Sequence, residues 1–233
     1  MNINIIERTK YTDEQVKLIN EISLKFRIDK EVAKLLVSRN VCSIEEAEKF
    51  LFVSNDSLYD PYLLSGMKEF VERLTTAIDN QETIVVYGDY DADGICGAYI
   101  LTQALLDLGA NAIPYIPNRS EGYGLNIQAI EEIAEEYFPD LIITCDLGIS
   151  CFEEVEYIKN LGIDVMVSDH HELPAVLPEC IKINPKLDEG KYPCIDLCGA
   201  GVAFKIIQAL MPNEFMKFIE FACIATVADS ITL

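Results

Sequence analysis

The sequence predicts an α/β protein: a doubly wound, mainly parallel five-stranded sheet with helices on both faces, preceded by a helical N-terminal extension. Three observations predict this fold class. Five short apolar runs follow residue 82, helical patterns of roughly 10 to 15 residues separate most of them, and residues 12–79 show helical spacing without a strand signal. Strands that are apolar on both faces and joined by helices are typical of a parallel sheet covered on both sides. We therefore divide the chain into a helical extension, residues 1–80, and an α/β domain, residues 81–233.

Capping residues mark the helices of the extension. Thr12 and Gln15 form a capping box before the first segment with helical periodicity, and Asp29 is placed to cap the second. Ser43 and Glu46 form another capping box, which predicts a short third helix. These signals are local, so they predict where helices begin but not how the helices pack.

The pattern changes along the rest of the chain. Asp60-Pro61 interrupts the helical spacing, because a proline disfavours helical backbone in the residue before it, and the spacing resumes over residues 66–79. The expected strands are residues 83–87, 112–116, 141–145, 165–167 and 181–183. The expected helices are residues 95–108, 126–137 and 151–160, followed by 200–211 and 213–228.

Composition excludes several classes of protein. The 233 residues include 39 acidic and 18 basic side chains, a formal net charge of −21, so bulk electrostatics do not favour binding to nucleic acid or anionic lipid. A polyanionic substrate would need a local positive device such as bound metal ions. No apolar run reaches the ~18 residues of a membrane span, and no signal-peptide pattern is found, so we expect a cytoplasmic protein without a membrane partner. The eight cysteines form no CxxC pair, which favours reduced thiols over disulfides or a zinc site.

Acidic side chains follow three of the five expected strands, at the point where each strand ends. The chain's two histidines join them there, and the set is Asp89, Asp91 and Asp93, then Asp146, then Asp169, His170 and His171. Because the carboxyl ends of parallel strands meet at one edge of a sheet, we expect these groups to lie together. Crowded carboxylates repel one another, and a divalent cation relieves that repulsion. Carboxylate and imidazole ligands without thiolate suit manganese or magnesium, and two such ions ~3.5–4 Å apart activate water for phosphoryl displacement.

Each acid taken singly has a structural interpretation as well. Aspartates are common in turns and at helix N-caps, which would explain Asp89, Asp91, Asp93 or Asp146 without a metal. An isolated Asp-His-His triplet could form a solvated loop. The joint placement after successive strands favours the metal site.

Several motifs resemble the DHH phosphoesterase superfamily. The resemblance rests on Asp169-His170-His171 together with VYGDYDADG at residues 86–94. Further stretches resemble the RecJ family of single-stranded-DNA-specific 5′-to-3′ exonucleases within it: GMKEFVERL (66–74), PNRSEGYGL (117–125), INPK (183–186), GAGVAFK (199–205) and TVAD (226–229). Residues 38–51 followed by Tyr59-Asp60-Pro61 are similar to the N-terminal extension of that family. The ordered set covers nearly the whole chain.

The resemblance implies roles for individual residues. It implies a metal-ligand set of Asp91, Asp93, Asp146, His170 and Asp229, with Asp89 completing the first site and Asp146 as the bridging ligand. His171 is implied to face the scissile phosphate or the leaving oxygen. Asp169 is implied to orient an imidazole, which physically means fixing its tautomer. Tyr87 stands where some relatives carry a histidine ligand, and this departure weakens the first site unless Asp89 compensates.

Three further features have two interpretations each. Arg119 could hold a substrate phosphate through two hydrogen bonds, or pair with Glu121 at the surface. Tyr123 could stack on a base or pack in the core. The segment Gly199-Ala200-Gly201 could present free amides to a phosphate, or allow close packing of a helix on the sheet.

The resemblance implies metal-dependent hydrolysis of single-stranded DNA in repair and recombination, with manganese preferred, magnesium as the alternative, and replication or repair proteins as partners. It also implies a DHHA1 domain and an OB-type domain, which we do not find before Leu233. We therefore expect these residues alone to bind metal but to degrade DNA weakly or not at all. Two alternatives stay open. One is a phosphodiesterase for nanoRNA or cyclic dinucleotides, or a pyrophosphatase, of the same superfamily. The other is a non-catalytic scaffold derived from the domain.

Overall fold

A computed structural model of the chain describes residues 10–53, 57–119, 122, 124–187 and 191–232. Contacts divide it into two compact units, Met1–Leu58 and Tyr59–Leu233. The first unit contains α1 (Asp13–Phe26), α2 (Lys30–Ser38) and α3 (Ile44–Leu51). One face of each helix is buried, and the shared core is Ile19, Ile22, Ala33, Leu36, Val37, Val41 and Ala47. The predicted helical segments of residues 12–51 are confirmed.

The caps of the first unit follow the sequence signals with one difference. Thr12 accepts a hydrogen bond from the backbone of Gln15, whose side chain accepts from Thr12, so the predicted capping box is complete. Ser43 caps α3 by accepting from the amide of Glu46. The Glu46 carboxylate, however, accepts from the amide of Cys42 rather than from Ser43. The second box is therefore only half formed, because the acid reaches one residue further back.

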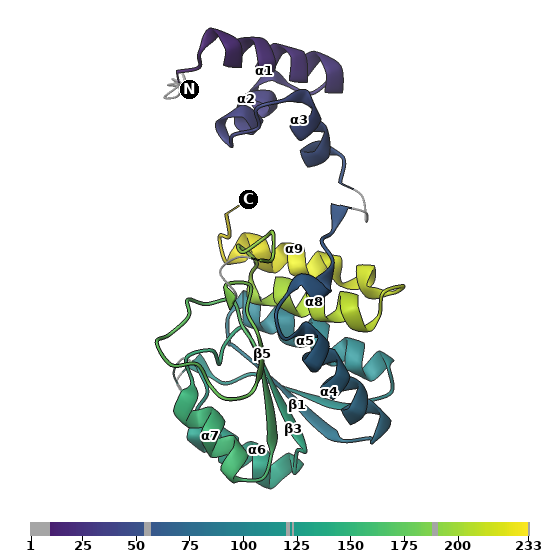
Figure 1. The fold of residues 1–233 in the computed structure, drawn as a ribbon, viewed down its shortest axis with the longest axis vertical. Helices are drawn as coiled ribbons and strands as arrows, with labels where there is room; N and C mark the ends of the chain where they lie inside the picture. Colours follow the sequence, from purple (N-terminus) through teal and green to yellow (C-terminus); the bar gives the residue numbers. More distant parts are fainter. Residues whose placement is uncertain (1–9, 54–56, 120–121, 123, 188–190, 233) are drawn as a thin grey trace, which may run out of the picture. The chain divides into compact units, whose positions relative to one another are not determined.

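The second unit is built on a five-stranded sheet in which all pairs are parallel (Figure 1). The strands lie in the order β2-β1-β3-β4-β5. Their bounds are β1 (Thr83–Gly88), β2 (Asn111–Tyr115), β3 (Leu141–Cys145), β4 (Asp164–Ser168) and β5 (Ile181–Ile183). All five predicted strands are confirmed, with ends that differ by one residue at most. The chain winds outward from β1 to β2 and then resumes on the other side at β3, and this change of direction is where open α/β sheets bind ligands.

Helices cover both faces of this sheet (Figure 1). On one face lie α6 (Ile127–Tyr137) and α7 (Phe152–Asn160), packed on a core formed by alternate residues of β1, β3 and β4. α5 (Ala92–Asp107) and α8 (Gly199–Leu210) pack on each other and on the sheet, and α9 (Ile219–Ala228) packs on both helices. The 3-10 turns η2 (Pro61–Leu63) and η5 (Phe215–Phe218) lie against α8. The doubly wound fold class is therefore confirmed.

Helix α4 (Met67–Asp79) packs on the sheet unit, although the sequence pattern grouped it with the extension. It lies against β5 and α8. Arg73 of α4 bonds Asp164 through Nε at 2.6 Å and Glu82 through its terminal nitrogen at 2.7 Å. These bonds fasten α4 to the amino ends of β1 and β4. The division at residue 80 stays a prediction about domains, whereas by contacts α4 belongs with the sheet.

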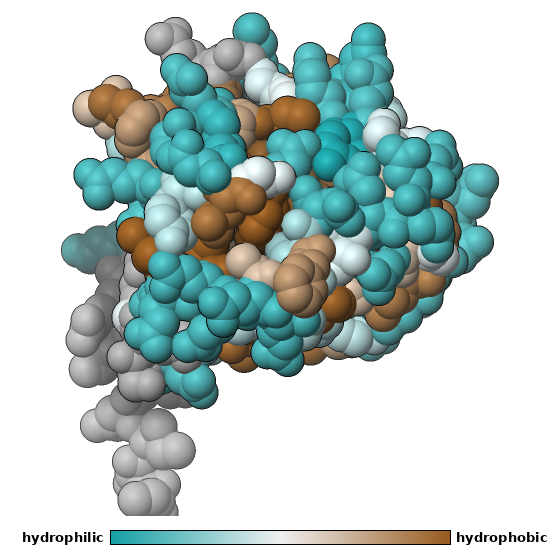
Figure 2. Space-filling view, turned by 90° about the horizontal axis from the view of Figure 1, so that it is seen from below, coloured by the Kyte–Doolittle hydropathy of each residue, from teal (hydrophilic) through white to brown (hydrophobic). Residues whose placement is uncertain are grey.

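Much of the visible surface is hydrophilic, although half of the residues are hydrophobic (Figure 2). Figure 2 shows that hydrophilic side chains cover much of the face seen from below, with hydrophobic ones gathered in patches between them. Among the described residues, no helix combines the length and the apolar character that crossing a membrane would require.

Candidate metal centre

The predicted site residues leave the sheet at its carboxyl edge, and the backbone there continues the strand ladder by one hydrogen bond per loop. The amide of Asp89 donates to Cys145 O, that of Asp146 to Ser168 O and that of Asp169 to Ile183 O. Each donor is the first residue after its strand, and each acceptor lies in the last residue of the neighbouring strand. The three loops are thereby held in register, so their side chains emerge at one level.

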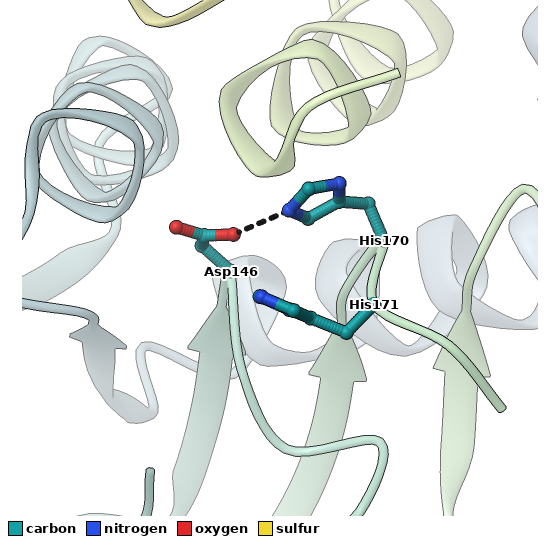
Figure 3. Close-up of side chains that lie close together, drawn as sticks. All are labelled: Asp146, His170 and His171. Atoms are coloured by element: carbon teal, nitrogen blue, oxygen red, sulfur yellow. Dashed lines mark ion pairs between the residues drawn. The ribbon is translucent and has the colours of Figure 1, made fainter. Parts of the chain in front are cut away.

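Three overlapping groups of side chains place their ligand atoms within 4.8 Å of one another. The groups are Asp89, Asp91 and Asp146; Asp93, His170 and Asp229; and Asp146, His170 and His171. Asp146 and His170 are each shared by two groups. His170 Nε2 lies 3.1 Å from Asp146 Oδ1, 3.7 Å from Asp93 Oδ2 and 3.8 Å from Asp229 Oδ2. Figure 3 shows Asp146 and both histidines turned toward the same space.

Asp91 and Asp93 are held by the N-termini of two different helices. Asp91 is the N-cap of α5 and accepts from the amides of Asp93 and Gly94 through Oδ1. Asp93 accepts from the amide of Gly199 at 2.6 Å and from that of Ala200 at 2.7 Å, at the start of α8. The capping role considered from the sequence therefore exists for Asp91, and it coexists with membership of a ligand group.

Asp146 is the most constrained carboxylate of the cluster. Its φ of 67° lies in the left-handed region, which Asp and Asn tolerate better than most residues. A Cβ on Gly199 would stand 2.5 Å from its carboxylate, so only glycine fits opposite it. Burial, followed by the charges of Asp93 and Asp91, raises the pKa of Asp146 to about 10. Without a cation, the site therefore favours a protonated Asp146.

Two buried carboxylate oxygens support the fit of a cation. Oδ1 of Asp89 and Oδ1 of Asp146 are buried and accept no hydrogen bond from the described residues. The approach of His170 Nε2 to Asp146 does not have hydrogen-bond geometry. Burial and the charge of Asp91 also raise the pKa of Asp89. Buried acceptors without donors are costly, and a hard divalent cation satisfies them with the oxygen and imidazole ligands present here.

Nearby thiols do not join this ligand set. Cys145 and Cys198 are buried, and burial raises the pKa of both thiols. The thiolate, not the thiol, binds metals, so these groups are poor ligands as placed. Cys198 instead caps α8 by accepting from the amide of Gly201.

Asp169 lies outside the three groups and positions the histidines. Its Oδ1 accepts from the amides of His170 and His171 and from Nδ1 of His171 at 2.8 Å, while Oδ2 accepts from the amide of Ile149. These bonds hold the pKa of Asp169 below its ordinary value, although burial alone would raise it. In turn, the bond to Asp169 raises the pKa of His171. With Nδ1 engaged, His171 presents Nε2 to the cluster.

Arg119 and Tyr87 lie outside the three ligand groups. Arg119 is exposed, and its Cζ lies 5.3 Å from the centroid of the Tyr90 ring, at the rim of the cluster. Tyr87 is fully buried in the core beneath α6 and donates to Gly124 O at 3.4 Å, with its ring 5.1 Å from that of Tyr115. It therefore braces the segment after β2 rather than facing the acids. Glu121 and Tyr123 lie outside the described residues.

Sequence reasoning missed two supports of the site. The Gly199-Ala200-Gly201 amides were considered for phosphate binding or as a packing segment, but they are engaged by Asp93 and by Cys198 Sγ. Asn184, at the end of β5, donates to His171 O at 2.9 Å and accepts from the amide of Lys186. The INPK motif contains Asn184, but a motif alone does not say which loop it supports.

This chain is similar to a known protein family, to several known proteins and to solved structures. The family described as "DHH family, N-terminal domain" matches residues 83–230. The single-stranded-DNA-specific exonuclease RecJ of Bacillus subtilis (strain 168) is 41% identical over 222 residues, which cover 94% of this chain and 28% of that protein. The RecJ of Escherichia coli (strain K12) is 34% identical over 246 residues, covering 97% of this chain and 40% of that protein. This chain therefore spans well under half of these relatives.

Solved structures agree in fold. The crystal structure of exonuclease RecJ bound to manganese aligns with a TM-score of 0.65 at 34% identity, covering 72% of this chain and 44% of that one. RecJ in complex with Mn2+ from Thermus thermophilus aligns with a TM-score of 0.68 at 27% identity, covering 92% of this chain and 30% of that one. A complex with Mg2+ from the same organism aligns with a TM-score of 0.57.

Proposed function

This chain belongs to the DHH family, and we propose that its carboxyl-edge cluster binds two divalent cations and hydrolyses phosphodiester bonds as part of a single-stranded-DNA-specific 5′-to-3′ exonuclease. One observation carries the proposal: three ligand groups overlap, because Asp146 and His170 each belong to two of them, and the groups with Asp146 contain buried carboxylate oxygens that accept no hydrogen bond from the described residues. Shared ligands are what two adjacent ions require, because one carboxylate then bridges them. Asp146 is the proposed bridge.

The two proposed sites differ in ligand chemistry. Asp89, Asp91 and Asp146 offer oxygen atoms only, whereas the group with Asp93 and Asp229 includes the His170 imidazole. Oxygen ligands suit magnesium and manganese alike, and an imidazole favours the softer manganese. Manganese is therefore the proposed physiological ion, with magnesium as the alternative. Solved structures of RecJ contain Mn2+ in one case and Mg2+ in another.

The chain's own residues prepare the reaction. The bound ions would lower the pKa of a water and offset charge on the phosphoryl oxygens. Asp169 fixes Nδ1 of His171, which leaves Nε2 as the donor or acceptor facing the reacting phosphate. From this position, Nε2 can donate a hydrogen bond to the leaving oxygen. Arg119, at the rim, is placed to bind a phosphate oxygen of the substrate.

The substrate is inferred from the relatives. Proteins with 34% to 41% identity are single-stranded-DNA-specific exonucleases, which supports single-stranded DNA over nanoRNA, cyclic dinucleotides or pyrophosphate. All the acidic and histidine ligands that the resemblance implies are present except at Tyr87, and a non-catalytic scaffold would have no reason to keep buried carboxylate oxygens that accept no hydrogen bond from the described residues. Replication or repair proteins are the proposed partners, and the cytoplasm is the proposed compartment.

Metal binding tests the central claim. Calorimetric titration of the chain with manganese should show about two ions per chain. The variant Asp146→Asn should lose at least one, whereas Asp79→Asn, which removes an exposed carboxylate of α4, should retain both. Failure of the wild type to bind manganese contradicts the proposal. For the substrate, the matching assay uses a protein that joins this chain to the further domains that the resemblance implies, and compares hydrolysis of a 5′-phosphorylated single strand, a duplex, a dinucleotide and pyrophosphate. Preference for the dinucleotide or for pyrophosphate would favour the corresponding alternative, and preference for the duplex would contradict single-strand specificity.

A further inference from the structure

Tyr90 lies between two proposed metal ligands in the sequence. It occupies the turn from β1 to α5, with Asp89 before it and Asp91 after it, and it is half-buried. The guanidinium carbon of Arg119 lies 5.3 Å from its ring centroid. From this contact we propose that Tyr90 is a positioning residue that holds Arg119 as a phosphate clamp at the rim of the metal cluster. The inference rests on the proposed function, and it identifies Tyr90 as the residue that orients Arg119 toward a substrate phosphate.

The backbone that carries the Tyr90 ring is held on both sides. The amide of Asp89 donates to Cys145 O, which ties the turn to β3. Asp91 caps α5 by accepting from two amides of its first turn. The Tyr90 side chain therefore leaves the backbone at a position set by the sheet and by the helix.

Contact with the Tyr90 ring restrains the Arg119 side chain before a phosphate binds. Arg119 follows β2 and is exposed, and a free arginine side chain has about 2 kcal/mol of rotamer entropy to lose on binding. A guanidinium attracted to the face of an aromatic ring is restrained before the ligand arrives. A guanidinium over an aromatic face keeps its N–H edges open, and those edges make the paired hydrogen bonds to a phosphate. The ring thus orders the cation without occupying its donors.

The location of the pair suits a phosphate close to the ions. β2 and β1 are neighbours, so the loops that carry Arg119 and Tyr90 leave adjacent strands at the same edge. A phosphate held there lies beside the acidic cluster rather than on the far side of the sheet. The chain has a net charge of −21. An ordered Arg119 guanidinium beside the cluster therefore attracts a phosphate group to this place rather than to the acidic surface elsewhere.

Nucleotide binding by the manganese-loaded chain tests the proposal. The probe is thymidine 5′-monophosphate, titrated by calorimetry into the wild type and into Tyr90→Leu, Tyr90→Phe, Arg119→Ala and the double variant Tyr90→Leu/Arg119→Ala. Tyr62→Leu, which removes a 52% exposed ring of η2, is the matched control.

We expect Tyr90→Leu to weaken nucleotide binding about three- to tenfold, because the cation–π restraint is lost. Tyr90→Phe keeps the aromatic face and should stay within about twofold of the wild type. Arg119→Ala should cost about tenfold or more. The double variant should bind no more weakly than Arg119→Ala, because the ring acts through the arginine. Manganese stoichiometry should be unchanged in all variants, and Tyr62→Leu should match the wild type throughout.

Each contrary outcome has a distinct meaning. Equal binding by Tyr90→Leu and the wild type, equal loss in Tyr90→Phe and Tyr90→Leu, or additive losses in the double variant would each overturn the positioning role. Reduced manganese stoichiometry in Tyr90→Leu would overturn it too, since the ring would then support the carboxylates instead. A wild type that binds manganese but not the nucleotide refutes the clamp and leaves the metal centre standing. A wild type that binds no manganese refutes the proposed function itself.

Discussion

Replacing Asp146 by asparagine should stabilise the metal-free protein while removing its response to manganese. Asparagine has nearly the same shape and tolerates the left-handed backbone at φ 67°, so the change isolates the charge. An alanine would add backbone strain and would confuse the two effects. The amide introduced can donate to the neighbouring carboxylates of Asp93 or Asp91, whose charges oppose ionisation of Asp146.

The magnitude follows from the pKa of Asp146. Burial raises it from 3.8 to about 10 in the metal-free fold. Between those values the folded state binds a proton that the unfolded state has released, so stability falls as the pH rises through this window. The difference between pH 7 and the unfolded-state pKa of 3.8 sets the size of the effect. At about 1.4 kcal/mol per pH unit, it lowers the free energy of unfolding at pH 7 by at most about 4 kcal/mol. The raised pKa values of Asp89 and His171 act in the same direction.

Urea unfolding followed by circular dichroism measures this effect. In EDTA, the unfolding free energy of the wild type should fall from pH 5 to pH 8, and Asp146→Asn should show a clearly shallower slope and a higher midpoint at pH 8. Manganese should raise the wild-type midpoint, because a ligand that binds the folded state stabilises it, and should do much less for the variant. Equal pH slopes for the two proteins in EDTA would refute the argument that burial of this carboxylate opposes folding.

Three further predictions use other contacts. Gly199→Ala should weaken manganese binding about tenfold or more, because its Cβ would meet the Asp146 carboxylate, whereas Gly201→Ala, whose Cβ has no neighbour closer than 3.5 Å, should bind normally in the same titration. Arg73→Met should lower the unfolding free energy by about 2 kcal/mol without changing manganese stoichiometry, and an unchanged urea midpoint would contradict this. Asp169→Asn should lower the pKa of His171 in the metal-free protein, as measured by NMR titration, because the hydrogen-bonded carboxylate that raises it is lost.

The fold could be predicted because its signals are local. The strands β1, β3 and β4 are short runs buried on both faces, and caps such as Thr12 and Asp29 mark helix starts within a few residues. The placement of α4 could not be predicted in this way. Its attachment depends on Arg73, which bonds Asp164 across 91 residues of sequence, and no local pattern reports such a partner.

The sequence indicated which residues gather in the candidate site, but not which hydrogen bonds hold them in place. Topology alone brings Asp89, Asp146 and His170 together, because consecutive parallel strands end at one edge. The supports come from distant segments: Asp93 is bonded by amides 106 and 107 residues away. The sequence shows that α8 begins with small residues, but it does not show which carboxylate accepts hydrogen bonds from their amides.

The engagement of those amides bears on how so acidic a chain could bind a polyanion. The N-termini of α5 and α8 each carry partial positive charge, and in this fold they are directed at Asp91 and Asp93 rather than at solvent. The helix ends therefore offset the cost of crowding ligands before any cation arrives. Having been used for that purpose, they are not available to a substrate phosphate. Attraction for a phosphate must then come from the cations themselves and from a side chain at the rim, which is why the contact between Arg119 and Tyr90 matters more here than a lone surface pair would.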